Sequence, residues 1–177
     1  EFEGIRTDLL RFAYACYAGE LIERLAQEEE ASESLYELAL DALRWFAEER
    51  DLRLWSRYFE LRLLAQSGYQ PELFTCVVCH APIQPQTNFF SVAQGGLLCN
   101  QCSQAEPRAK ALSVNAQKVL RYLQKQSPEG VRALAVSEAT HAELEDVLED
   151  YLEYTLEREL KSVAFLRRLR RELRQTR

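Results

Sequence analysis

The chain has 177 residues, of which 47% are hydrophobic, and a formal net charge of −6. This length fits one domain, or one domain with a small insert, and allows a core to form without disulfides. The sequence has no apolar run long enough to span a bilayer and no basic leader, so it predicts neither a membrane span nor a secretion signal. Its negative charge argues against bulk nucleic-acid affinity, so any such contact must come from a local patch.

Residues 3–30 carry apolar side chains at helical spacing on two opposite sides. One stripe consists of Leu10, Tyr14, Tyr17, Leu21 and Leu25. The other consists of Ile5, Leu9, Phe12 and Cys16. The pattern predicts one helix that is buried from two directions, with the Cys16 thiol in the core.

Two further helices follow, and we expect the three to pack antiparallel as the first part of a helical domain, residues 1–72. Ser34 and Glu37 form a capping box that predicts the start of the second helix, which ends near residue 50. The third helix begins near Leu52 and ends at Gly68, which favours a C-terminal cap.

Arg50, Arg53 and Arg57 are spaced to lie on one face of the third helix, beside apolar positions. A cationic stripe that borders apolar surface suits an acidic peptide ending in a hydrophobic residue. Alternatively, these arginines pair with the acidic faces of neighbouring helices. The sequence leaves both interpretations open.

Two Cys-x-x-Cys pairs follow the third helix, namely Cys76 with Cys79 and Cys99 with Cys102. Their spacing is typical of a zinc site, because each pair lets two thiolates converge on one tetrahedral ion. Four thiolates leave no position open for water, so we predict one structural Zn²⁺ per chain. Two disulfides or four free thiols fit less well, because the segment has too few apolar residues to fold by itself.

The cysteines define a small zinc ribbon, residues 73–106, inserted into the helical domain. Residues 88–92 and 97–98 are candidate short strands, with turn residues at Pro82, Pro85 and Gly95. His80 is redundant as a ligand and is expected at the surface. The predicted fold class is therefore mainly α, a helical bundle with an inserted four-cysteine ribbon.

Residues 107–177 are expected to complete the helical domain. Ser113 predicts the N-cap of a helix that ends at the turn residues 127–130. Thr140 and Glu143 form a capping box for the next helix, with His141 exposed in its first turn. The acidic side of that helix is expected to be solvated, or to meet a basic partner, and consists of Glu143, Asp146, Glu149, Asp150, Glu153 and Glu157.

The chain ends in a basic amphipathic helix. From Lys161 to Arg177 there are seven basic residues and one acidic residue. Apolar Leu166, Leu169 and Leu173 lie on one side. The basic side carries Arg167, Arg168, Arg170, Arg171 and Arg174. This helix is either a solvated end that packs by its leucines or a secondary, sequence-independent contact with nucleic acid.

The sequence contains no catalytic constellation that we recognise. It has no Gly-rich phosphate loop and no nucleophile elbow, and neither of its two histidines is paired with a nucleophile. We therefore expect that the protein is not an enzyme.

Three passages follow one another in a distinctive order. They are FELRLLAQSGY at residues 59–69, the ribbon that opens with CVVC at 76–79, and YLEY at 151–154 followed by LKS at 160–162 and FL at 165–166. In this order they resemble the C-terminal helical region of the RecO family of bacterial DNA repair proteins, over nearly the whole chain. Methionine is absent, also at position 1, which indicates a processed chain or a fragment of a longer protein.

The resemblance implies a recombination mediator. Such a protein displaces single-strand-binding protein, anneals complementary strands and, with its partner RecR, assists loading of the RecA recombinase. It also implies an N-terminal OB-fold that binds single-stranded DNA, which this chain does not contain. The C-terminal tail of single-strand-binding protein then becomes the expected ligand of Arg50, Arg53 and Arg57.

Two departures limit what the resemblance transfers. Family members often carry His where this chain has Thr155, so a role of that His is not carried over. Some members lack the cysteines, which supports a structural role for zinc.

Two classes of function stay open at this point. In the first, the helical domain of a recombination mediator recruits proteins and assists DNA contact in the cytoplasm, at the nucleoid. In the second, the chain is a zinc-ribbon scaffold that binds only protein partners. Thiolates arranged for a metal fit a reducing compartment, which agrees with the cytoplasm.

Overall fold

The computed structural model describes residues 2–26, 33–156 and 160–175 of the chain. The fold is mainly helical with a small sheet, as predicted. The helices are α1 (Glu3–Thr7), α2 (Leu9–Ala26), α3 (Glu33–Glu48), α4 (Leu52–Gln66), α5 (Val114–Lys125), α6 (Pro128–Arg132), α7 (Glu138–Thr155) and α8 (Lys161–Gln175). In the described ranges, no helix has the length and apolar character needed to cross a membrane.

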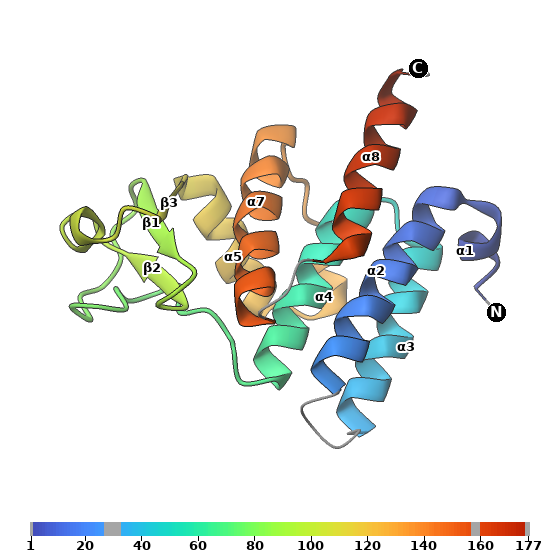
Figure 1. Cartoon of the computed structure of the whole chain (residues 1–177), viewed down its shortest axis with the longest axis horizontal. Helices are drawn as coiled ribbons and strands as arrows, with labels where there is room; N and C mark the ends of the chain where they lie inside the picture. Colours follow the sequence, from blue (N-terminus) through green and yellow to red (C-terminus); the bar gives the residue numbers. More distant parts are fainter. Residues whose placement is uncertain (1, 27–32, 157–159, 176–177) are drawn as a thin grey trace.

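Helix α4 lies at the centre of the helical body. It contacts α2 and α3 on one side and α5 and α7 on the other (Figure 1). Because it has neighbours on both sides, almost all of its residues are buried, including polar Ser56, Arg57 and Glu60. Aromatic rings fill the contact with α3: Trp45 lies 5.0 Å from Trp55 and 5.1 Å from Tyr58 between ring centroids.

The predicted first helix is interrupted at Asp8. This residue is extended, with φ −124° and ψ 115°, and its Oδ1 accepts hydrogen bonds from the backbone N–H groups of Leu10 (2.8 Å) and Arg11 (3.1 Å). An aspartate that satisfies free N–H groups in this way starts a new helix. The chain therefore forms the short α1 and the longer α2.

The prediction that this helix is buried from two directions is wrong. Tyr14 and Tyr17 of the first stripe are buried between α3, α4 and α8. Leu9 and Phe12 of the second stripe are 58% and 51% exposed, and Cys16 is exposed rather than a core thiol. Helical periodicity shows which side chains share a face, but it does not show whether another element covers that face.

The small sheet has three antiparallel strands in the order β2-β1-β3. They are β1 (Asn88–Ser91), β2 (Gly96–Leu98) and β3 (Lys110–Leu112). The first two are the predicted strands, with Phe90 opposite Leu97. β3 was not predicted, and it extends the sheet beyond the expected 73–106 insert. Gly96 is required where it lies, because a Cβ there would come within 2.4 Å of the Glu72 carbonyl oxygen.

The sheet packs against the helical body through Tyr151 of α7. Its ring lies 5.4 Å from that of Phe90, and its hydroxyl donates to the Tyr69 carbonyl at 2.9 Å. In Figure 1 the ribbon lies at one end of the molecule, next to α5 and α7, and the N-terminal helices lie at the other.

The predicted first residues of some helices agree with the structure, and those of others differ from it. Ser113 caps α5 as expected, by accepting from the Ala116 N–H. Ser137, not Thr140, caps α7, and Glu143 instead accepts from the Ser113 N–H at 2.8 Å. Helix α3 begins at Glu33, so Ser34 lies within its first turn. The predicted turn after α5 contains the short helix α6, because Pro128 favours the first helical position.

A buried ion cluster joins the two halves of the chain, and it consists of Tyr17, Arg57, Glu60 and Glu149. Arg57 Nη2 lies 2.5 Å from Glu60 Oε1, which also accepts from the Tyr17 hydroxyl at 2.7 Å. Arg57 Nη1 lies 4.0 Å from Glu149 of α7. Glu149 is only 5% exposed, so the predicted solvated acidic face is wrong at this residue.

The environment of His141 also differs from the prediction. Instead of being exposed, His141 is 5% exposed, and its Nε2 lies 3.0 Å from Asp51 Oδ2. Asp51 caps α4 by accepting from the Leu54 N–H. The contact between His141 and Asp51 therefore connects the start of α7 to the start of α4.

We predict that Arg57→Met lowers the free energy of unfolding by about 3–5 kcal/mol, because it leaves the fully buried Glu60 without its cation, whereas Glu149 keeps its ion pair with Arg167. Urea unfolding followed by circular dichroism measures this loss. Arg44→Met is the matched control, since Arg44 and Asp41 form an exposed pair on α3 that contributes less than about 1 kcal/mol. Equal small losses in both variants would contradict the importance of the cluster.

Candidate metal centre and arginine groove

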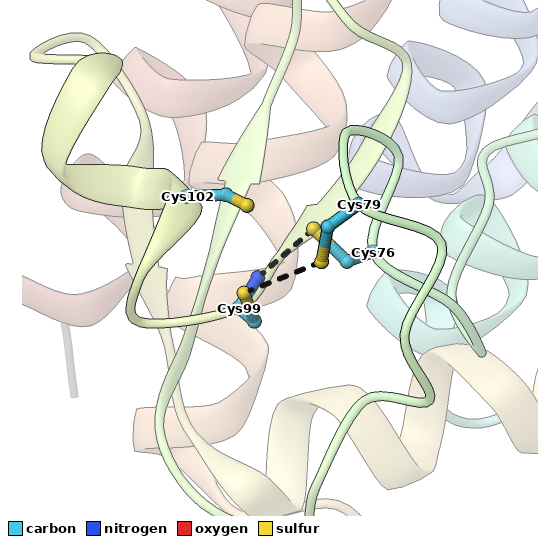
Figure 2. A group of neighbouring side chains, drawn as sticks. All are labelled: Cys76, Cys79, Cys99 and Cys102. Carbon is cyan, nitrogen blue, oxygen red and sulfur yellow. Dashed lines mark hydrogen bonds between the residues drawn. The ribbon is translucent and has the colours of Figure 1, made fainter.

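The four predicted cysteine ligands converge at the base of the ribbon. Figure 2 shows their side chains directed toward one another. The sulfur atoms of Cys76, Cys79, Cys99 and Cys102 all lie within 4.8 Å of one another. A tetrahedral ion with bonds of about 2.3 Å to thiolates requires sulfurs about 3.8 Å apart. The observed 3.9 Å between Cys79 Sγ and Cys99 Sγ fits that requirement.

Two disulfides are excluded in this arrangement. All four cysteines are free, and a disulfide would need its two sulfurs about 2.05 Å apart. The turns that carry the thiols come from two separate parts of the ribbon. Cys76 and Cys79 precede β1, while Cys99 follows β2 and Cys102 begins a short 3₁₀ helix, Cys102–Ala105.

The backbone around Cys76 favours its thiolate. Burial opposes ionisation of Cys76, but N–H groups of Cys79, Cys99 and Val78 stabilise its thiolate and lower its pKa to about 6. Hydrogen bonding to Cys99 raises the pKa of Cys102 to about 12. Because neighbouring thiolates repel one another, a bound cation is needed before all four can ionise. A metal ion supplies that charge.

His80 is exposed, as predicted, and is not part of the ligand group. Its backbone has a positive φ of 57°, and its N–H donates to the Cys76 carbonyl at 2.8 Å. Its contribution is therefore to close the first cysteine turn.

We expect the purified protein to contain about one metal ion per chain, and Cys99→Ser to lose it, because three thiolates no longer close the tetrahedron. Plasma mass spectrometry measures the metal. Cys16→Ser is the control and should keep full occupancy, since Cys16 lies on α2 and is exposed.

Relative to the parent protein, Cys99→Ser should increase hydrogen exchange more in β1 and β2 than in α2, α3 and α4, because the cysteine turns precede β1 and follow β2. Full metal occupancy in Cys99→Ser would contradict the four-cysteine assignment.

The structure separates the three arginines predicted on the third helix. Arg57 is 3% exposed and belongs to the buried ion cluster, so a partner has no access to it. Arg53 is 15% exposed and pairs with Glu145 at 2.7 Å and Glu138 at 2.6 Å. Arg53 and Arg57 therefore form ion pairs within the protein, as the second interpretation of these arginines predicts. Arg50 is exposed.

The basic side of α8 is also divided. Arg170 is 16% exposed and pairs with Glu145, and Arg167 pairs with Glu149. Arg168 is 76% exposed and pairs with Glu172 one turn away, at 2.9 Å. Arg171 is exposed and has no ion pair within the described part of the chain. The side chain of Arg174 lies outside the described residues.

The leucine side of α8 holds the helix against the body. Leu166 and Leu169 are 5% and 6% exposed, and α8 packs mainly on α2. Leu173, nearer the C-terminus, is 45% exposed. The prediction that α8 docks by its leucines therefore holds for its first three turns.

The arginines of α4 and α8 meet in a groove that has two connected parts. The first part is a hollow of about 530 Å³, lined by Arg53, Glu138, Ala142, Glu145, Arg167, Arg170 and Arg171. The second part is a hollow of about 350 Å³, lined by Leu10, Tyr14, Arg50, Asp51, Leu52, Arg53 and Arg170. We call their union the arginine groove, because Arg53 and Arg170 line both. Sequence spacing did not predict that these two sets of arginines converge.

Glu145 pairs with both arginines that line the two parts of the groove, Arg53 and Arg170. Burial alone would raise the pKa of Glu145, but the hydrogen bond from Arg53 and the charges of Arg57 and Arg170 lower it to about 2. A carboxyl whose folded pKa lies below its unfolded value stabilises the fold above the unfolded pKa, here 4.5. That stabilisation is lost as the pH falls toward 2.

We predict that Glu145→Gln is less stable than the parent protein at pH 7, and that the difference shrinks steadily between about pH 5 and pH 2. Urea unfolding of both proteins at several pH values measures the difference. Glu172→Gln is the control, since Glu172 is 57% exposed and should change little at any pH. A difference that is the same at pH 7 and pH 3 would show that Glu145 does not stabilise by charge.

The fold and the site together define a helical protein with an inserted ribbon whose four cysteines lie close enough to hold a metal ion. Residues 6–164 match the family described as Recombination protein O C terminal. The chain belongs to this family.

The sequences of several named bacterial proteins align with nearly all of the chain. The DNA repair protein RecO of Roseiflexus sp. (strain RS-1) is 42% identical over 173 residues, which are 98% of this chain and 61% of the relative. The protein of the same name from Dehalococcoides mccartyi (strain ATCC BAA-2100) is 36% identical over 169 residues, 96% of this chain and 66% of the relative. The protein of the same name from Desulforudis audaxviator (strain MP104C) is 38% identical over 170 residues, which are 96% of this chain and 67% of the relative. The chain spans about three fifths to two thirds of the length of these relatives.

Proposed function

We propose that this chain is the C-terminal part of a recombination mediator that acts in DNA repair. The observation that carries the proposal is family membership over residues 6–164, together with relatives that are named DNA repair protein RecO. In this proposal the complete protein anneals single strands, displaces single-strand-binding protein and, with RecR, loads the recombinase. The region described here recruits proteins and assists DNA contact.

The metal in the proposal is Zn²⁺. Four thiolates in a tetrahedral arrangement are the ligand set that structural zinc prefers, and they leave no coordination position for a substrate. The ion would fix the two cysteine turns and thereby the β1–β2 hairpin, whose Leu97 and Leu98 are fully buried. Its role is structural.

The arginine groove is the proposed site for the acidic tail of single-strand-binding protein. Four arginines but only two glutamates line its first part, so an anionic ligand is favoured there. Leu10, Tyr14 and Leu52 line the second part and supply apolar surface for a terminal hydrophobic side chain. Arg50 and Arg171 have no ion pair within the described ranges, so both can bind a carboxylate without first leaving another one.

Arginines of α8 that stay accessible are the proposed auxiliary DNA contacts. Arg167 is 55% exposed and Arg168 is 76% exposed, although each pairs with a glutamate. Arg170 is mostly covered in the groove. The contribution of this helix to DNA contact is therefore proposed to be smaller than its count of arginines suggests.

The groove is tested with a synthetic acidic peptide that ends in Phe, titrated into the protein in a calorimeter. We predict that the double variant Arg50→Glu, Arg171→Glu binds the peptide at least about tenfold more weakly, because two accessible cations become repulsive. The control is Arg108→Glu, an exposed arginine just before β3 that does not line the groove. Unchanged affinity in the double variant, or equal loss in the control, would contradict the site.

A further inference from the structure

A second cationic surface lies on α5, outside the arginine groove. Lys118 lies three and four residues before the adjacent Arg121 and Tyr122, and Lys125 lies four and three residues after them, so all four share one side of the helix. Lys118, Tyr122 and Lys125 are exposed and Arg121 is half-buried. In Figure 1, α5 lies beside the ribbon, whereas α8 lies on the other side of α7.

Phe74 brings an aromatic ring to the same surface from the start of the ribbon. Its side chain is 39% exposed. Lys125 Nζ lies 4.2 Å from the ring centroid, and Arg121 Cζ lies 5.3 Å from it. Arg121 is positioned by its Nε, which donates to the Leu73 carbonyl at 2.7 Å. Ribbon and helix thus bring one aromatic ring within cation–π distance of two cations.

Arg62 of α4 extends the surface at the C-terminal end of α5. Its Nη2 donates to the carbonyl of Gln126, the residue after Lys125, and to the Tyr58 hydroxyl at 3.0 Å. Its guanidinium lies 4.9 Å from the Tyr58 ring centroid. We call the whole surface the α5 strip, and it consists of Arg62, Phe74, Lys118, Arg121, Tyr122 and Lys125.

The cations of the α5 strip have no carboxylate partner in the part of the chain that the structure describes, which distinguishes them from the cations of the buried cluster and of the groove wall. Within the described ranges, none of Arg62, Lys118, Arg121 and Lys125 forms an ion pair, whereas Arg53, Arg57 and Arg170 all do. Glu72 is the acidic group whose charge acts on Arg121, but its Oε1 accepts from the N–H groups of Phe74 and Thr75. In a chain of net charge −6, this concentration of unpaired cations is a local positive patch that suits a ligand with several negative charges.

We propose that the α5 strip is a contact site for single-stranded nucleic acid. From Lys118 to Lys125 the cations extend over about 10 Å along the helix, which suits a row of phosphates. Exposed aromatic rings beside such a row are the surfaces on which bases stack in sequence-independent single-strand sites. The Phe74 ring is 39% exposed, so part of its surface is accessible to a base in the proposed complex.

The aromatic ring beside the cations favours nucleic acid over an acidic peptide. The carboxylates of an acidic peptide would use the cations, and only its terminal hydrophobic side chain could pack on the flat face of Phe74. A base has a π-face that matches it, whatever the sequence. The site is separate from the arginine groove, which has no exposed aromatic ring between its cations in the described residues.

The test measures binding of a fluorescein-labelled oligothymidylate by anisotropy between about 50 and 200 mM salt. The double variant Lys118→Gln, Lys125→Gln should bind about tenfold more weakly near 0.1 M salt, and the magnitude of the log-log salt slope should fall by about 1.4, which is 0.7 for each lost phosphate contact. Both lysines are exposed and unpaired, so the fold should be retained, and thermal melting checks this. The charge-matched control is Arg6→Gln, Arg108→Gln, two exposed arginines outside the strip, which should keep the slope.

Phe74→Leu separates stacking from charge. It keeps every cation, so the salt slope should stay the same while affinity falls about fivefold or more through lost stacking. An unchanged slope in the double lysine variant would overturn the proposal. The proposal would also be overturned if the double lysine variant bound the acidic peptide of the groove experiment more weakly but bound oligothymidylate like the parent. The strip would then be a peptide site.

Discussion

The burial of Arg57 is the constraint on which the arrangement of the helices depends. A guanidinium that is removed from water must be paired, and its carboxylates must come from elements that pack around it. Glu60 supplies one from the same helix and Glu149 supplies the other from α7. Tyr17 of α2 donates to Glu60, and Arg167 of α8 pairs with Glu149. Helices that precede the ribbon in the sequence, α2 and α4, are therefore connected with helices that follow it, α7 and α8, through the group of side chains that pairs with Arg57.

A second group of ion pairs, centred on Glu145, decides which cations of the groove are available at the surface. Glu145, whose pKa is lowered to about 2, pairs with Arg53 and Arg170 and fixes both in the wall of the groove. Arg50 and Arg171 border the same groove without an ion pair in the described part of the chain. The paired arginines, Arg53 and Arg170, form the wall of the groove. The arginines without an ion pair in the described ranges, Arg50 and Arg171, can bind a ligand. The α5 strip, by contrast, has unpaired cations that are positioned by backbone carbonyls and by aromatic rings.

Features that depend on local chemistry were predictable from the sequence. Cysteine spacing identified the group that the structure brings within 4.8 Å, because two turns that close on one ion require that spacing. Ser113 was identified as a cap because a serine before a helix satisfies a free N–H. The mainly helical class and the β1–β2 hairpin also followed from periodicity and turn residues.

Features that depend on distant partners were not predictable. Glu149 and His141 looked exposed because their helix is acidic, but Arg57 and Asp51, from another part of the chain, cover or pair with them. Leu9, Phe12 and Cys16 looked buried because a helical stripe has the same pattern whether or not another element covers it. The convergence of Arg53 with Arg170 likewise depends on how α8 returns to α4.

The central claim is that the ion pairs divide the free cations between two separate surfaces, the arginine groove for an acidic peptide and the α5 strip for single-stranded nucleic acid. Nuclear magnetic resonance titration of the isotope-labelled chain, with each ligand in turn, tests this most directly. The account predicts that the peptide shifts the backbone amide signals of Arg50, Arg53 and Arg171, and that oligothymidylate shifts those of Phe74, Lys118 and Lys125. Both ligands shifting the same set of signals would contradict it.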